Sequence, residues 1–188
     1  MITYLLLLIL LIIIYIDLYH DNGVPECKIH KSEYGDEYCI TDSNTDTANI
    51  LSRLNADIVY LLYCLKYGGG SYTQTQQKII KRVLENYNPD NIVENPPDGK
   101  DTSFTIGKGK ILALCVRSNN KSRPVEYNTI LYVCLHELSH LGVDEIGHDD
   151  EFNEAFDFLL AEAIKYKIYK YVDYSKNPAY YCNMLIDS

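Results

Sequence analysis

The sequence predicts an α+β domain that follows an N-terminal transmembrane helix. Three features support this prediction: an uncharged apolar run at the start of the chain, stretches in which apolar residues recur at helical spacing, and short β-type segments around a glycine-containing turn. A length of 188 residues fits one domain with an appendage, and a content of 47% hydrophobic and 23% charged residues is typical of a globular protein.

Residues 1–19 are expected to anchor the protein in a membrane, with the lipid bilayer as a partner. The run MITYLLLLILLIIIYI carries no charge and ends at Asp17. As a helix with a rise of 1.5 Å per residue it would span about 24 Å. Leu18 and Tyr19 extend it toward the ~30 Å hydrocarbon core of a bilayer. No basic segment precedes the run and no small-residue cleavage site follows it, which argues against a removed signal peptide.

Residues 20–46 are expected to form an acidic juxtamembrane spacer without regular structure, because they are polar and lack periodicity. Residues 17–46 hold eight acidic and two basic side chains of a chain whose net charge is -9. This acidity argues against nucleic acid as a partner. Cys27 and Cys39 bracket the segment. In an oxidising compartment they are the favoured disulfide pair, and six buried thiols are the equal alternative.

Residues 47–188 are expected to form the folded domain. Its apolar residues at helical spacing predict one helix that ends before Gly68 and a second helix over residues 74–86. Residues 88–100 contain three prolines, so a loop is expected there. The segments TSFTI and ILALCVR flank the sequence GKGK and predict a β-hairpin over about residues 102–117.

Residues 128–152, NTILYVCLHELSHLGVDEIGHDDEF, hold the strongest indication of function. His136, Glu137 and His140 form an HExxH motif after the uncharged run TILYVCL, which predicts a helix buried in the core. Residues four apart lie on the same side of a helix, so the two imidazoles can bind one metal ion. Glu137 projects beside them, placed to accept a proton from water rather than to bind the metal.

A catalytic zinc site needs a third protein ligand, and His148 is the favoured candidate. It follows Gly142 and Gly147, which can end the helix and turn the chain back. The predicted cofactor is therefore Zn2+, bound by His136, His140 and His148.

Other assignments around this site stay open. Glu154 or Glu162 on the next helix is the alternative third ligand, as in sites with two histidines and one glutamate. Asp149 is interpreted as a capping or supporting group at the start of that helix. A tetrahedral oxyanion also needs a partner besides the metal. The candidates for this role, between which the sequence does not choose, are Tyr127, Tyr174, Tyr180, Tyr181 and Arg117.

The order of these motifs resembles the WLM metallopeptidases, relatives of the SprT-like proteases. In that family HExxH is followed by a third histidine and an aromatic residue in an HDxxF-like context, which HDDEF matches here with His148, Asp149 and Phe152. The chain is most similar to small WLM-like proteins of large DNA viruses. These have a hairpin resembling TSFTIGKGKILALCVR and a tail resembling YKYVDYSKNPAYYCNMLI, so the resemblance covers residues 47–186. Asn183 stands where the pattern has glycine, which puts a local turn in question.

The resemblance implies a zincin-like domain with His136, His140 and His148 on zinc and Glu137 as the general base. The expected function is a membrane-anchored zinc metallopeptidase that hydrolyses a protein or peptide substrate. Cellular WLM proteins act on proteins crosslinked to DNA, and the acidity of this chain argues against that substrate.

The alternative function is that of a structural protein. In this interpretation the chain is a minor capsid-type component of a virion, or of a viral or host internal membrane. It would retain the fold with or without zinc and contact neighbouring capsid or membrane proteins.

Overall fold

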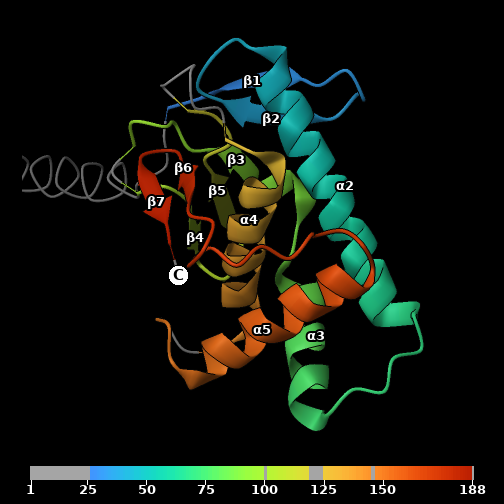
Figure 1. Ribbon diagram of the computed structural model, residues 1–188. Helices are drawn as coiled ribbons and strands as arrows, with labels where there is room; N and C mark the ends of the chain where they lie inside the picture. The colour runs from blue at the N-terminus through green and yellow to red at the C-terminus, as the bar shows by residue number, and fades with distance from the viewer. Residues whose placement is uncertain (1–25, 100, 119–124, 145–146, 188) are drawn as a thin grey trace, which may run out of the picture.

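The computed structural model describes residues 26–99, 101–118, 125–144 and 147–187. Over these residues the fold is mixed α+β, as predicted. In Figure 1 helix α4 runs through the centre of the molecule, with α2 to its right, sheet strands behind it, and α5 and α3 below. The helices are α2 (Thr45–Tyr67), α3 (Gln74–Asn86), α4 (Tyr127–Gly142) and α5 (Asp150–Lys165).

A five-stranded mixed sheet has the strand order β1-β2-β3-β5-β4. Its two outer pairs are antiparallel and its two inner pairs are parallel, and β4 forms one edge. A second sheet pairs β6 with β7 in antiparallel fashion. The strands are β1 (Lys28–Lys31), β2 (Glu37–Ile40), β3 (Ile92–Glu94), β4 (Phe104–Ile106), β5 (Ile111–Leu114), β6 (Ala179–Tyr181) and β7 (Met184–Ile186).

Two segments that were expected to be irregular instead contribute strands to the sheet. The described part of the expected spacer forms β1 and β2, and α2 already begins at Thr45. The expected loop over residues 88–100 holds a 3-10 turn, η1 (Pro89–Asn91), followed by β3 at the centre of the sheet. Strands of three or four residues are too short to show a period of two. Pairing with neighbours on both sides defines β3, and those neighbours are distant in sequence.

The helices and the hairpin follow the sequence prediction because local signals define them. The side chain of Asn44 accepts a hydrogen bond from the Asp46 amide and begins α2. Thr73 and Gln76 form a capping box that begins α3. Strands β4 and β5 pair on either side of a turn in which Gly107, Lys108 and Gly109 all have positive φ.

Two disulfides cross-link the chain, one at the β1–β2 pair and one between distant segments. The favoured pair, Cys27–Cys39, is present beside β1 and β2, so the alternative of six thiols is wrong. A second disulfide, Cys115–Cys182, joins residues separated by 67 positions and connects the end of β5 to the β6–β7 turn. Cys64 and Cys134 are buried free thiols.

The β6–β7 turn forms without a glycine at position 183. Cys182 is the residue with positive φ, at 53°, whereas Asn183 does not adopt such a conformation. The side-chain amide of Asn183 donates a hydrogen bond to the carbonyl oxygen of Pro97. The departure from the family pattern therefore leaves the turn intact.

The expected anchor, residues 1–19, lies outside the described residues. Within the part of the chain that is described, no helix is both long and apolar enough to cross a membrane.

Candidate metal centre

Helix α4 is buried along most of its length, and one row of side chains reaches a cleft. Between Thr129 and Val143, the residues that are not buried are Tyr132, His136 and His140. They are spaced four apart and so share one face of the helix. The remaining faces contribute to the core, as the apolar run before HExxH predicted.

His148 joins this row from the segment that leads into α5. The side chain of Asp149 accepts a hydrogen bond from the Phe152 amide at 2.9 Å and caps α5, as expected for Asp149. The ring of Phe152 is buried and packs against all three imidazoles, with centroid separations of 4.8, 4.4 and 4.6 Å to His136, His140 and His148. Phe152 therefore fixes the third histidine against the two on α4.

The three histidines form a cluster that could bind a metal ion. Their potential ligand nitrogens all lie within 4.8 Å of one another, and the Nε2 atoms of His136 and His148 are 3.0 Å apart. Nitrogens at 2.0–2.1 Å from a tetrahedral zinc ion are separated by about 3.3 Å, so small side-chain adjustments suffice for coordination.

The surroundings favour neutral imidazoles, which are the form that binds metal. Burial, followed by the nearby His140 and His148, lowers the pKa of His136 to about 4. Burial likewise lowers the pKa of His140 to about 4, with further contributions from His148 and Lys108. The donor set and its electrostatics thus fit a divalent cation.

Glu137 is the buried carboxyl of the site. Its exposed fraction is 6%, and its Oε2 accepts a hydrogen bond from the Thr105 hydroxyl on β4 at 3.1 Å. Burial raises the pKa of Glu137 to about 7, while the hydrogen bond from Thr105 acts in the opposite direction. Thr105 is a contact that the sequence analysis missed, because it depends on how the hairpin packs against α4.

The alternative carboxylate ligands lie away from the cluster. Among the described residues, the group that could hold a metal consists of the three histidines, without Glu154 or Glu162. Glu162 accepts hydrogen bonds from Tyr72 and Lys165, and Glu154 is exposed on α5.

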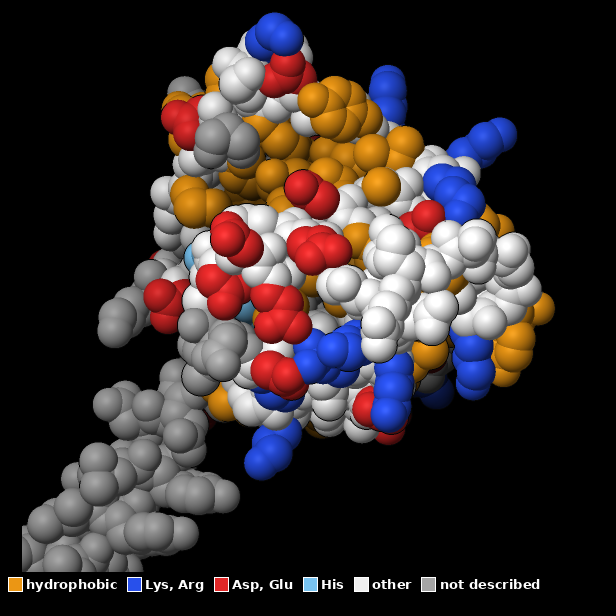
Figure 2. Space-filling view, turned by 90° about the horizontal axis from the view of Figure 1, so that it is seen from below, with side chains coloured by type: hydrophobic (Ala, Val, Ile, Leu, Met, Phe, Trp, Pro, Cys, Tyr) orange, Lys and Arg blue, Asp and Glu red, His pale blue; other side chains and the backbone are white. Residues whose placement is uncertain are grey.

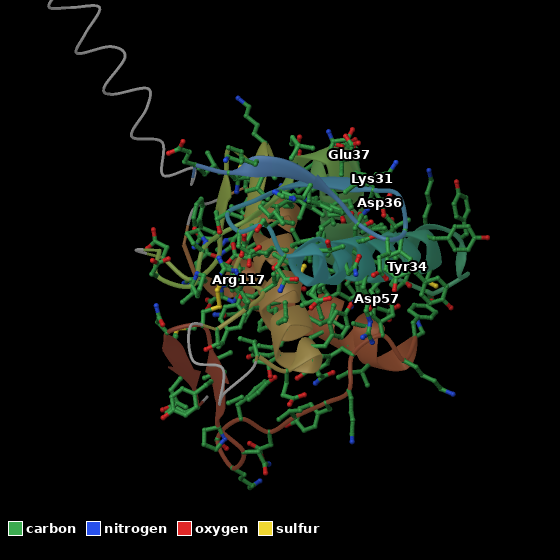
Figure 3. All side chains as sticks on the ribbon, turned by 90° about the horizontal axis from the view of Figure 1, so that it is seen from above. Lys31, Tyr34, Asp36, Glu37, Asp57 and Arg117 are labelled. Atoms are coloured by element: carbon green, nitrogen blue, oxygen red, sulfur yellow. A yellow bond between two sulfur atoms is a disulfide. The ribbon has the colours of Figure 1, made fainter. Side chains whose placement is uncertain are left out.

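The five candidate oxyanion partners do not line the cleft. Arg117 pairs with Glu94 at 2.5 Å and with Asp42 at 3.2 Å at the end of the sheet (Figure 3). Tyr127 donates to Asp57 on α2, which Figure 3 also labels.

The remaining candidate tyrosines, on or near β6, also lie outside the cleft lining. The Tyr181 hydroxyl is buried and lies 2.5 Å from that of Ser103. Tyr174 is buried, and Tyr180 is half exposed on β6.

The cleft in front of the histidines has a volume of about 800 Å³. Lys108 is one lining residue that the sequence analysis missed; its ammonium donates to the carbonyl oxygens of Val143 at 2.8 Å and His140 at 3.4 Å. Tyr132 is another, and its position four residues before His136 could have revealed it. The lining comes from α4, the β4–β5 hairpin, Gly147 and β7: Thr102, Ser103, Phe104, Thr105, Gly107, Lys108, Tyr132, Val133, His136, Glu137, His140, Gly147, His148, Met184, Leu185, Ile186 and Asp187.

Viral proteins are similar to parts of this chain. An uncharacterised protein of Acanthamoeba polyphaga mimivirus is 46% identical over 96 residues, which are 51% of this chain and 49% of that protein. Uncharacterised proteins of Invertebrate iridescent virus 3 and Invertebrate iridescent virus 6 are 40% and 36% identical, over 43% and 36% of this chain and 51% and 38% of those proteins. The matched part spans about half the length of these relatives, or less. No protein-family profile matches the chain.

Two crystal structures of Wss1 from Saccharomyces cerevisiae are similar at low identity. One shows 23% identity and a TM-score of 0.38, over 50% of this chain and 76% of that chain. The other, of a Wss1 mutant, shows 19% identity and a TM-score of 0.40, over 69% of this chain and 92% of that chain. Function depends on the residues of the site rather than on the fold.

Proposed function

We propose that this protein is a zinc-dependent metallopeptidase of the WLM type, anchored in a membrane through residues 1–19. The position of Glu137 is the observation that carries the proposal. Its buried carboxyl lies in the same cleft as the three clustered histidines but outside the group that could bind the metal. A zinc site that only holds a fold together needs no such carboxyl, whereas water activation requires one.

The residues of the chain divide the chemistry between them. His136, His140 and His148 would hold Zn2+, which would supply Lewis acidity toward a water molecule and the scissile carbonyl. Glu137 accepts the proton of the attacking water and returns it to the leaving amine. Thr105 orients the Glu137 carboxyl through its hydrogen bond of 3.1 Å. The ring of Phe152 holds the three imidazoles in place.

The shape and charge of the region support a peptide substrate. Strand β4 is at the edge of the sheet and lines the cleft, so its outer edge can pair with an extended peptide. Acidic side chains gather on the face seen from below in Figure 2, beside an area of hydrophobic side chains. Helix α5, which follows His148, contributes the exposed Asp150, Glu154 and Asp157. Negative charge at this position disfavours the phosphates of a nucleic acid.

The test of this proposal measures zinc content and proteolysis of the full-length chain in detergent. Elemental analysis should find about one zinc ion per chain in the wild type and in Glu137→Gln, and none in the His136→Ala, His140→Ala double variant. Hydrolysis of fluorescent casein should fall by about 1000-fold in Glu137→Gln. If Glu137→Gln hydrolyses casein as fast as the wild type, Glu137 is not the general base.

The same experiment separates the enzyme from a structural virion or membrane protein. Bound zinc without hydrolysis, together with a fixed ratio to a capsid protein in purified particles, would favour the structural alternative. If the folded chain binds no zinc, the HELSH segment is an inherited helix without a metal-binding role. Membrane fractionation of the wild type and of a chain lacking residues 1–19 tests the anchor separately.

A further inference from the structure

The cleft continues beyond the histidines into an apolar half. On α4 this half begins at Tyr132, one turn before His136 in the partly exposed row, and includes the neighbouring Val133. Strand β7 contributes three further apolar lining residues, Met184, Leu185 and Ile186. The half that holds the histidines is lined instead by polar and glycine residues such as Gly107, Lys108 and Gly147.

The pairing of β6 with β7 shows which side chains of the hairpin face the domain. Tyr181 lies opposite Met184, and Ala179 lies opposite Ile186, so these four side chains share one face. Tyr181 and Ile186 are buried on that face, yet Met184 keeps an exposed fraction of 43%. Met184 is therefore an apolar side chain on the inward face that borders open space in the cleft.

Tyr132 borders the same space from a fixed position. Its ring packs against Phe156, Tyr169 and Tyr174, with centroid separations of 5.2, 6.0 and 4.8 Å. These contacts immobilise the ring while one side remains accessible from the cleft. A fixed aromatic surface and a flexible methionine in the lining of one cleft suit an apolar side chain of variable shape.

We infer that Tyr132 and Met184 form a pocket that binds a large apolar side chain of a peptide, next to the metal centre. A peptide extended along β4 would pass the histidines and insert one leucine-sized or phenylalanine-sized side chain between α4 and β7. The enzymatic consequence, cleavage close to a large apolar residue, rests on the proposed function, whereas binding does not.

The pocket can be tested by binding and cleavage of matched peptides. The probes are fluorescein-labelled octapeptides of Gly, Ser and Ala with a single Phe, Leu, Ala, Ser or Lys at one position. Binding is measured by fluorescence polarisation with zinc-loaded, full-length Glu137→Gln in detergent, and cleavage with the wild type. Phe and Leu peptides should bind about tenfold or more tightly than Ala and Ser peptides, the ratio expected for burial of one large apolar side chain.

Met184→Asp is the decisive variant, because Met184 is partly exposed and its replacement should leave the core intact. In the Glu137→Gln background, Met184→Asp should bind the Phe peptide and the Ala peptide with about equal affinity. Its zinc content should not change. Ile29→Asp is the matched control, since Ile29 is an apolar residue with an exposed fraction of 65% on β1, at the other edge of the sheet. This control should keep the wild-type ratio.

Two results would overturn the inference: equal binding of Phe and Ala peptides, or an undiminished ratio in Met184→Asp. Preferential binding that depends on Met184, without cleavage by the wild type, would support the pocket and contradict the proposed function. If the wild type cleaves all the peptides equally well, the result would support the proposed function and contradict the pocket.

Discussion

Helix α4 and the β6–β7 hairpin form two walls of the same cleft, but they are held in different ways. Helix α4 is buried over most of its surface and packs against α3, α5 and β4. The hairpin is held by partners far away in sequence: a disulfide across 67 positions, a hydrogen bond between Tyr181 and Ser103, and one between Asn183 and Pro97. Three of the groups proposed for the chemistry, His136, Glu137 and His140, thus lie on the buried helix, whereas Met184 of the proposed pocket lies on a tethered element.

The largest effect should come from removing the tether of the hairpin. Replacing Cys115 and Cys182 by serine is expected to lower the free energy of unfolding by about 4 kcal/mol, because opening a closed loop of 67 residues restores much entropy to the unfolded chain. Chemical denaturation measures this loss. Hydrogen exchange of the β7 amides should become faster, while zinc stays bound.

The disulfide at the other end of the sheet is the matched control. Replacing Cys27 and Cys39 by serine should cost about 3 kcal/mol, because the closed loop spans only 12 positions. Hydrogen exchange at β7 should not change in this variant. If the β7 amides exchange at the same rate in both disulfide variants, the hairpin does not depend on its disulfide.

The two walls also differ in how far the sequence predicts them. The helical period predicted α2, α3 and α4, and the spacing of His136 and His140 predicted their common face. Asp149 was interpreted as a capping group and caps α5, and Phe152, part of the motif that resembles the WLM pattern, packs against the histidines. Local sequence was sufficient here because each helix and each cap depends on residues that are close together along the chain.

The rest of the site depends on contacts that local sequence does not encode. Thr105 reaches Glu137 across 32 positions, and β3 is defined by its neighbours in the sheet. The Cys115–Cys182 pair is one of many that six cysteines allow. The sequence therefore predicts the proposed metal ligands but not most of the cleft around them.

On the buried helix α4, the charged form of Glu137 should lower the stability of the folded protein. The pKa of this carboxyl is about 7 in the folded protein, above its ordinary value of 4.5, so the folded state disfavours its charged form. The contribution of this carboxyl to the stability of the metal-free protein should therefore be greatest at or below pH 4.5 and fall as the pH rises toward 7. Glu137→Gln lacks this charge and should be more stable at pH 8, by at most about 3 kcal/mol.

Denaturation at pH 4.5 and pH 8 with a chelator present measures this difference. Glu154→Gln is the matched control because Glu154 is exposed on α5, and it should show no comparable change with pH. A Glu137→Gln protein that is less stable than the wild type at pH 8 would indicate that the buried carboxylate is well satisfied.

The third histidine tests whether the site extends beyond α4. His148→Ala should lower zinc affinity by at least about 100-fold, because loss of a ligand exceeds the 10–100-fold cost typical of groups that support ligands. Competition with a chromophoric chelator measures the affinity. His30→Ala, on the edge strand β1, is the control and should bind zinc normally. Unchanged affinity in His148→Ala would reopen the assignment of a carboxylate ligand from α5.

The smallest effect is expected at Arg82, which links the two elements on either side of His148. Its guanidinium on α3 donates to Glu151 at the start of α5, at 2.7 Å, and pairs with Asp144 just after α4. Arg82→Gln should therefore reduce zinc affinity only a few-fold and lower the free energy of unfolding by about 1 kcal/mol, since partly exposed ion pairs contribute little each. Lys81→Gln, whose pair with Glu85 is exposed on the same helix, should change neither quantity. Because screening by salt weakens such pairs, the difference in affinity between wild type and Arg82→Gln should shrink at high ionic strength. A difference that persists there would mean that Arg82 acts through packing rather than charge.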